Sequence, residues 1–327
     1  MALTPIDEIH AAQIAAGTIG RTKGHEFEAK LSADLNQLAA IPDVEPVKGE
    51  QRHLKVGHPD RELVRYILRS KGLKGVKNIR AAWLGGLATF KKGDVVKSKS
   101  GIVVKRSKSD ILLEISHSGG VDNIGVSVKT CHNKTPTNDQ LYCTTAQAFA
   151  NLLRNNKIPV SDAAERALRM FCGDPGFRPC DDASTPKDRV CSNERWFYDE
   201  LPQTERNEFQ SIFSKYQREI STILLQKAYP EDDPHAPEFL LHQTVAFSDI
   251  AKCECAIFRM DELVDQSCKR SGFSTASYTV KKGRFKSSVP HLAPRFGFIQ
   301  FQRLGNKQNA TQLQFNLEAG YFYKLSE

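Results

Sequence analysis

The sequence predicts a mixed α/β (α+β) fold, with a mixed central sheet flanked by helices and a β-rich C-terminal part. Apolar residues recur at helical spacing over residues 25–38. Apolar runs at 109–115 and 124–129, separated by a glycine-rich turn, are typical of paired strands. Strict alternation of apolar and polar residues over 311–317 indicates a strand near the C-terminus. With 327 residues, 40% of them hydrophobic and 26% charged, the chain can form one large core or two modest domains.

The first half of the chain contains two amphipathic segments before the predicted strands. Residues 1–23 are small and polar with scattered glycines, and we expect a loosely held start. A helix over 25–38 would bury Phe27, Leu31, Leu35 and Leu38. Glu28 lies beside this apolar stripe, so its carboxylate faces either solvent or a cleft. Residues 61–71 form a second predicted helix.

Basic residues are concentrated just before the first predicted strand. The net charge is +8, and this stretch carries Lys71, Lys74, Lys77, Arg80, Lys91, Lys92, Lys97, Lys99, Lys105, Arg106 and Lys108. Such a concentration favours a polyanionic partner that is bound through phosphates. The alternative is an ordinary solvated face.

The strand pair at 109–115 and 124–129 carries an acid and a lysine. Side chains alternate along a strand, so Asp110 and Glu114 share one face, opposite the apolar face. These two carboxylates are about 13 Å apart along a strand, too far to share one ion directly. A hairpin would place Lys129, which shares a face with Ser127, beside Asp110. The alternative for Asp110 and Lys129 is a cross-strand salt bridge, which contributes little at a surface.

Helices are predicted for the middle of the chain. Thr137 followed by Gln140 matches a capping box and predicts a helix over 138–153. Ser161 is the expected cap of a helix over 163–171. A long helix is expected over 205–227, with an apolar seam suited to a core.

The C-terminal part is predicted to be mainly strands, over 278–286, 296–303 and 311–317. Amide side chains pair with adenine, and arginine or lysine with guanine, in the major groove of DNA. The candidate base-reading residues are Gln300, Gln302, Arg303, Asn306, Lys307, Gln308, Gln312 and Gln314. Lys281, Lys282 and Arg284 suit phosphate contacts. A polar outer face of a sheet is the alternative.

The cysteines and the N-terminus give weaker signals. Cys172, Cys180 and Cys191 could hold zinc with His235 or His242, but structural zinc sites usually have more closely spaced ligand pairs, so zinc is disfavoured.

The N-terminus lacks the features of a signal peptide, and no window approaches the roughly 18 apolar residues of a membrane span. We therefore expect a cytoplasmic protein that does not enter a membrane.

Residues 25–155, with helix 25–38, both strands and helix 138–153, resemble the catalytic core of the PD-(D/E)xK nucleases. This superfamily includes many type II restriction endonucleases. Asp110 matches the first aspartate of the motif and Lys129 its lysine, while Ser127 stands where a second acid is usual. Some restriction enzymes share this Ser-x-Lys arrangement and take the missing carboxylate from the following helix. That helix offers Asp139, Gln140 and Gln147 here.

The resemblance implies a Mg²⁺-dependent, sequence-specific endonuclease for double-stranded DNA. Asp110 would bind the ion and Lys129 would assist the attacking water. Glu114, Glu28 and the carbonyl of Val128 are the candidates for the next ligand. Residues 1–160 would form the nuclease core, and residues 161–327 a helical connector and a β-rich DNA-recognition part.

A homodimer is expected, because cleavage of both strands at a symmetric site needs two active sites. The alternatives are a non-catalytic DNA-binding protein or regulator, and a repair or RNA-processing nuclease without sequence preference.

Overall fold

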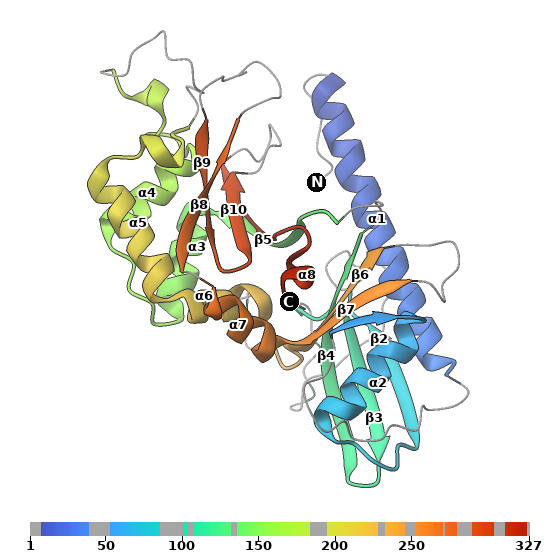
Figure 1. Cartoon of the computed structure of the whole chain (residues 1–327). Helices are drawn as coiled ribbons and strands as arrows, with labels where there is room; N and C mark the ends of the chain where they lie inside the picture. The colour runs from blue at the N-terminus through green and yellow to red at the C-terminus, as the bar shows by residue number, and fades with distance from the viewer. Residues whose placement is uncertain are drawn as a thin grey trace. The chain divides into compact units, whose positions relative to one another are not determined.

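A computed structural model of the chain describes residues 8–38, 53–85, 101, 103, 107–131, 136–183, 195–227, 233–245, 253–270, 272–279, 290–303 and 311–325. These residues form eight α-helices and two sheets, one of them mixed, which confirms the predicted fold class (Figure 1). None of the described helices is both long enough and apolar enough to cross a membrane.

The chain divides into two compact units, each assembled from interleaved segments. The six-stranded unit comprises Ala15–Asp139, Leu225–Leu263 and Ala319–Glu327. The five-stranded unit comprises Met1–Ile14, Gln140–Leu224 and Val264–Glu318. The expected division at residue 160 differs from this arrangement, because strands from the second half of the chain complete the sheet of the first half.

The six-stranded unit has a mixed sheet in the order β1-β7-β6-β4-β3-β2. Its strands are β1 (Leu54–Val56), β2 (Asn78–Trp83), β3 (Ile111–His117), β4 (Gly120–Thr130), β6 (Pro237–Val245) and β7 (Glu254–Arg259). Its helices are α2 (Pro59–Lys71), α8 (Tyr321–Lys324) and most of α1 (Glu8–Asn36). Strands β4 and β6 are parallel, whereas β2, β3 and β4 form an antiparallel meander.

The predicted hairpin is confirmed. Leu112 lies opposite Gly125 in the β3–β4 ladder, and the apolar residues Ile111 and Leu113 enter the core with Val126.

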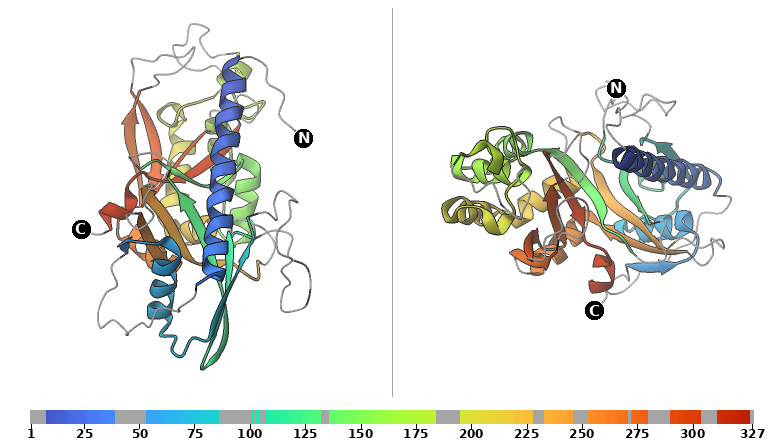
Figure 2. Two further views of the ribbon diagram at one scale, coloured as in Figure 1. Left: turned by 90° about the vertical axis from the view of Figure 1, so that its right-hand side faces the viewer. Right: turned by 90° about the horizontal axis from the view of Figure 1, so that it is seen from above.

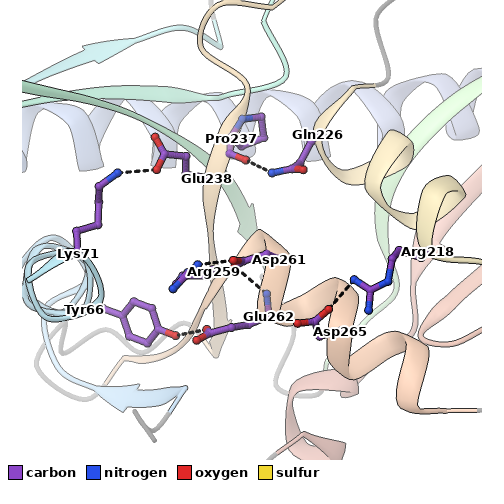
Figure 3. A network of polar contacts seen from close by, with 10 residues as sticks. All are labelled: Tyr66, Lys71, Arg218, Gln226, Pro237, Glu238, Arg259, Asp261, Glu262 and Asp265. Carbon is purple, nitrogen blue, oxygen red and sulfur yellow. Dashed lines mark hydrogen bonds and ion pairs between the residues drawn. The ribbon is translucent and has the colours of Figure 1, made fainter. Parts of the chain in front are cut away.

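Helix α2 packs on this core and is joined to its unit by polar contacts. Lys71 Nζ lies 2.7 Å from Oε2 of Glu238, and the Tyr66 hydroxyl donates to Glu262 over 3.1 Å (Figure 3).

Helix α1 begins at Glu8, so the expectation of a loosely held start is wrong for residues 8–23. The C-terminal part of α1 runs beside the edge strand β2 (Figure 2). Asn36 Nδ2 donates to the Ala81 carbonyl, and Asn36 Oδ1 accepts from the Ala81 N–H, both over 2.8 Å. The amide thereby satisfies edge groups of β2 that would otherwise be open to another strand.

The five-stranded unit has the sheet order β5-β11-β10-β9-β8. Its strands are β5 (Asp139–Thr145), β8 (Phe273–Tyr278), β9 (His291–Phe296), β10 (Ile299–Arg303) and β11 (Gln312–Leu317). Its helices are α3 (Ala146–Asn155), α4 (Asp162–Cys172), α5 (Gln203–Lys215), and most of α6 (Gln217–Gln226) and α7 (Met260–Lys269). Aromatic rings join the helices to the sheet. Phe149 of α3 contacts Phe315, and Phe213 of α5 stacks on Phe301.

The helix predicted over 138–153 is wrong in its first half. Asp139–Thr145 is strand β5, and the helix begins at Ala146 with Thr145 as its N-cap. The sequence Leu141-Tyr142-Cys143-Thr144-Thr145 is rich in β-branched and aromatic residues, and its strand joins β11, far along the chain. The polar stripe expected on one helix face is therefore divided between a strand and a helix.

Other boundaries also differ from the predictions. The helix capped by Ser161 is confirmed as α4, with the Ser161 hydroxyl accepting from the Ala164 N–H over 3.1 Å. The long helix expected over 205–227 is interrupted at Tyr216 between α5 and α6. The run 296–303 contains a turn at Gly297, whose φ of 53° suits glycine. Helix α7 was not predicted.

Removing the Thr145 cap is expected to destabilise the protein. Thr145 Oγ1 accepts from the Ala148 N–H over 3.2 Å, and loss of such a cap costs about 1 kcal/mol. Thr145→Ala should therefore lower the free energy of unfolding in urea by about that amount. Thr137→Ala is the matched control, because Thr137 would be the cap of the predicted helix. A larger loss for Thr137→Ala than for Thr145→Ala would contradict the observed helix start.

Candidate active site

Asp110 and Lys129 come together where β3 begins and β4 ends. The backbone N–H of Asp110 donates to Val126 over 2.9 Å, and its carbonyl accepts from the Leu84 N–H over 2.8 Å. Lys129 Nζ lies 3.7 Å from Oδ2 of Asp110, and both side chains are half-buried. The hairpin thus brings the acid and the lysine together, as the sequence predicts.

The Asp110 carboxylate is held in place by β4. Its Oδ2 accepts hydrogen bonds from the Val128 N–H over 2.6 Å and from the Ser127 hydroxyl over 3.2 Å. Lys129 Nζ donates to the Val128 carbonyl over 3.1 Å. Ser127, which stands where the nuclease motif has its second acid, therefore orients the first acid.

Glu28 of α1 supplies a second carboxylate to this cluster. Its side chain is buried, and Trp83 Nε1 donates to Oε2 over 3.1 Å. Burial, followed by the negative charge of Asp110, raises the pKa of Glu28 to about 8, against the opposing effects of the Trp83 hydrogen bond and Lys129. Gly85 links Glu28 to Asp110 in space, because its N–H donates to the Asp110 carbonyl and a Cβ on it would overlap Glu28 Oε2. Two negative carboxylates close together repel each other, and a bound cation would relieve that repulsion.

Gly85 allows the close approach of Glu28. Its N–H donates to the Asp110 carbonyl over 3.2 Å. A Cβ atom at this position would overlap Oε2 of Glu28 and lie 2.7 Å from Nε1 of Trp83. Only glycine leaves room for the carboxylate beside this backbone.

Gly85→Ala is therefore expected to displace Glu28 and destabilise the fold by about 1–3 kcal/mol, the usual cost of an added methyl group in a packed interior. Gly24→Ala, in the same helix as Glu28, is the control. A Cβ at Gly24 meets nothing within 4 Å, and alanine favours a helix, so that variant should be at least as stable as the wild type. Urea denaturation measures both, and equal stability of Gly85→Ala and the wild type would show that the contact is unimportant.

Lys108, two residues before Asp110, carries a second amine whose pKa is affected by this cluster. Burial, and then the positive charge of Lys129, lower the pKa of Lys108 to about 7, while Asp110 acts in the opposite direction. The basic stretch recognised in the sequence therefore ends at the acid–lysine cluster. The Lys129 amine and the carboxylates of Asp110 and Glu28 lie where this stretch ends.

These residues fit a magnesium ion better than a metal held by the protein alone. Mg²⁺ prefers hard oxygen ligands and is usually bound by one or two carboxylates, with water and substrate phosphates completing its shell. Glu28, Asp110 and the Val128 carbonyl provide such oxygens. Within the described ranges, no group of three or more His, Cys, Asp or Glu residues is arranged to hold a metal.

Glu114 lies on the same face as Asp110, four residues further along the strand. Its neighbours in the sheet are Arg80 on β2 and Asn123 on β4. Among the described residues, Glu28 approaches the Asp110–Lys129 pair through Gly85, whereas Glu114 lies between Arg80 and Asn123. The arrangement thus favours Glu28 as the second carboxylate and leaves Glu114 as a prediction without structural support.

The expected donors after β4 are used elsewhere. Asp139 starts β5 and is buried, with Oδ2 2.8 Å from Nε2 of His242. Cys172 is buried, and burial raises the pKa of its thiol. Cys180 is exposed, and Cys191 lies outside the described residues.

Among the described residues, the predicted base-reading amides of β10 and β11 share one face of the five-stranded sheet. Gln300 pairs with Asn316 and Gln302 with Gln314, whereas the intervening Phe301 is fully buried. Several amides are engaged within this face. Gln314 Nε2 donates to Gln140 Oε1 over 3.3 Å and to Asn316 Oδ1 over 3.0 Å, and Gln312 Oε1 accepts from the Cys143 thiol over 3.3 Å.

The other predicted DNA-binding residues are placed as follows. Gln302 is exposed and Arg303, at the end of β10, is half-buried. Lys281, Lys282, Arg284, Asn306, Lys307 and Gln308 lie outside the described residues.

The roles of Trp83, Gly85 and Ser127 were missed by the sequence analysis. The run Trp83-Leu84-Gly85-Gly86, which begins at the last residue of β2, is a signal of close packing that could have been used. A scan against protein-family models found no match to this chain, and a search of curated proteins found none either.

Proposed function

We propose that this protein is a Mg²⁺-dependent endonuclease that cleaves double-stranded DNA at a specific sequence, in the manner of a type II restriction enzyme. The convergence of Glu28, Asp110 and Lys129 from α1, the start of β3 and the end of β4 carries this proposal. An ordinary cross-strand salt bridge needs neither a buried second carboxylate nor a glycine that makes room for it.

Each residue of the cluster has a distinct chemical role in this proposal. Glu28 and Asp110 would hold the ion, and the Ser127 hydroxyl and the Val128 N–H keep Asp110 oriented. When bound, Mg²⁺ stabilises the charge that develops on the phosphate and lowers the pKa of a coordinated water. Lys129 presents a positive charge beside Asp110, where it would assist the attacking water or stabilise the developing oxyanion.

The charge and the amide-bearing sheet support DNA as the substrate. A net charge of +8 favours binding of a polyanion, and the strands β10 and β11 align amides on one face. Gln302, which is exposed, is the amide of β10 available to a base edge. A homodimer would supply one active site for each DNA strand.

Digestion of unmethylated plasmid DNA tests this function. The purified protein should convert supercoiled DNA to discrete fragments in Mg²⁺ and leave it intact in EDTA. A smear of products would instead indicate a nuclease without sequence preference. Tight DNA binding with no cleavage in Mg²⁺ or Mn²⁺ would indicate a non-catalytic DNA-binding protein.

A further inference from the structure

Asp233, which lies before β6, binds the segment that leads into β3. Its Oδ2 accepts from the backbone N–H of Lys108 over 2.7 Å, and its Oδ1 from the N–H of His235 over 3.0 Å. The Ser107 hydroxyl donates to both carboxylate oxygens, over 3.1 and 2.9 Å. One carboxylate therefore joins two segments that are distant in the sequence.

Ser109 continues this network to the residue next to Asp110. Its N–H donates to the Ser107 hydroxyl over 3.1 Å, and its own hydroxyl donates to the His235 carbonyl. Ser109 is buried. A Cβ at Gly125 would overlap the Ser109 hydroxyl and lie 2.5 Å from the His235 carbonyl oxygen, so glycine is required where these segments meet.

The elements on both sides of this network are fixed. Gln226 Nε2 donates to the Pro237 carbonyl over 2.9 Å at the start of β6 (Figure 3). β6 lies beside β4 in the sheet, and β4 also accepts the Asp110 N–H at Val126. The backbone from Ser107 to Asp110 is thus held by the Asp233 turn on one side and by β4 on the other.

We propose that Asp233 is a positioning residue of the phosphodiesterase site, which acts by fixing the backbone that presents Asp110. This inference rests on the proposed function. Asp233 touches Ser107, the Lys108 backbone and the His235 backbone, and it contributes no ligand to the ion. Residues that orient metal ligands typically affect metal affinity by about 10–100-fold when they are replaced.

The test compares Mg²⁺ dependence in Asp233→Asn and the wild type. Asparagine has one acceptor oxygen, so its Nδ2 cannot replace the oxygen that accepts from Lys108 or His235. The Mg²⁺ concentration for half-maximal cleavage should rise about 10-fold and kcat should fall, while KM for DNA stays within about twofold. A purely structural role would lower the amount of active protein without moving the Mg²⁺ midpoint.

Asp181→Asn is the matched control. Asp181 belongs to the five-stranded unit and also accepts backbone N–H groups, from Gly176 over 2.7 Å and Arg178 over 3.1 Å. The Asp181→Asn variant should leave the Mg²⁺ concentration for half-maximal cleavage unchanged. Should Asp233→Asn fail to fold, Ser107→Ala, which removes one link only, is expected to raise the midpoint about threefold.

The outcomes separate the two proposals. A wild-type protein that does not cleave DNA contradicts the proposed function. Cleavage by the wild type together with an unchanged midpoint in Asp233→Asn, or in Ser107→Ala if the first variant does not fold, overturns the role of Asp233 alone. An equal shift in Asp181→Asn also overturns it.

Discussion

Asp110→Asn is expected to lower the rate of Mg²⁺-dependent DNA cleavage at least about 10³-fold, equivalent to about 4 kcal/mol of lost transition-state stabilisation. Asparagine has nearly the shape of aspartate, and its oxygen can still accept from the Val128 N–H. It lacks the negative charge that pairs with Lys129 and that we propose binds Mg²⁺. The rate should be measured under single-turnover conditions, with the fold checked by circular dichroism.

Two further variants sharpen this prediction. Lys129→Ala should also lose most activity, because its amine lies 3.7 Å from the Asp110 carboxylate. Asp122→Asn is the control, since Asp122 lies on the same hairpin but pairs with His117 over 3.0 Å. If Asp110→Asn cleaves DNA as fast as Asp122→Asn does, the pair of Asp110 and Lys129 is only a salt bridge.

Glu28→Gln is expected to stabilise the metal-free protein at alkaline pH. The pKa of Glu28 is about 8 in the folded chain and about 4.5 ordinarily, chiefly because of burial. The raised value means that the neutral carboxyl favours folding below pH 4.5. This contribution is lost as the pH rises toward 8, because the folded state must then keep a charge in a buried position.

Glutamine is neutral at every pH and retains an oxygen for the Trp83 N–H. In EDTA at pH 8.5, Glu28→Gln should therefore exceed the wild type in free energy of unfolding by about 2–4 kcal/mol, and the difference should shrink toward pH 5. Urea denaturation at both pH values measures it. Glu26→Gln, on the exposed part of the same helix, should show no such dependence on pH.

Magnesium should reverse this order. The ion compensates the two carboxylates in the wild type, so added Mg²⁺ should raise the free energy of unfolding of the wild type at pH 8.5. Glu28→Gln should gain much less. If Glu28→Gln is less stable than the wild type in EDTA at pH 8.5, Glu28 is a structural anion and not a metal ligand.

Local sequence patterns correctly predicted the helices and strands whose formation depends on residues close together in the sequence. The alternation in 109–115 and 124–129 was sufficient for the hairpin, and Ser161 marked the start of α4 because capping is a local interaction. The Asp110–Lys129 pair followed from the hairpin, since the register of two strands fixes which residues are neighbours.

The elements and site residues that were not predicted depend on contacts between residues far apart in the sequence. Thr137 and Gln140 matched a capping box, but β5 forms because β11 pairs with it, and no local pattern shows this. The second carboxylate could not be identified from spacing, because Glu28 reaches the site through the packing of α1 beside β2 and through the space at Gly85. Asp233 was missed for the same reason, since it contacts residues that precede it by more than a hundred positions.

Sequencing of the DNA ends produced by the protein tests the central claim most directly. An unmethylated phage genome is incubated in Mg²⁺ with the wild type or with Asp110→Asn, and all new ends are mapped. If Glu28, Asp110 and Lys129 form a site-specific nuclease centre, the DNA ends made by the wild type should share one short sequence. These ends should be absent after incubation with Asp110→Asn. If the wild type produces only the ends that Asp110→Asn also produces, this claim is contradicted.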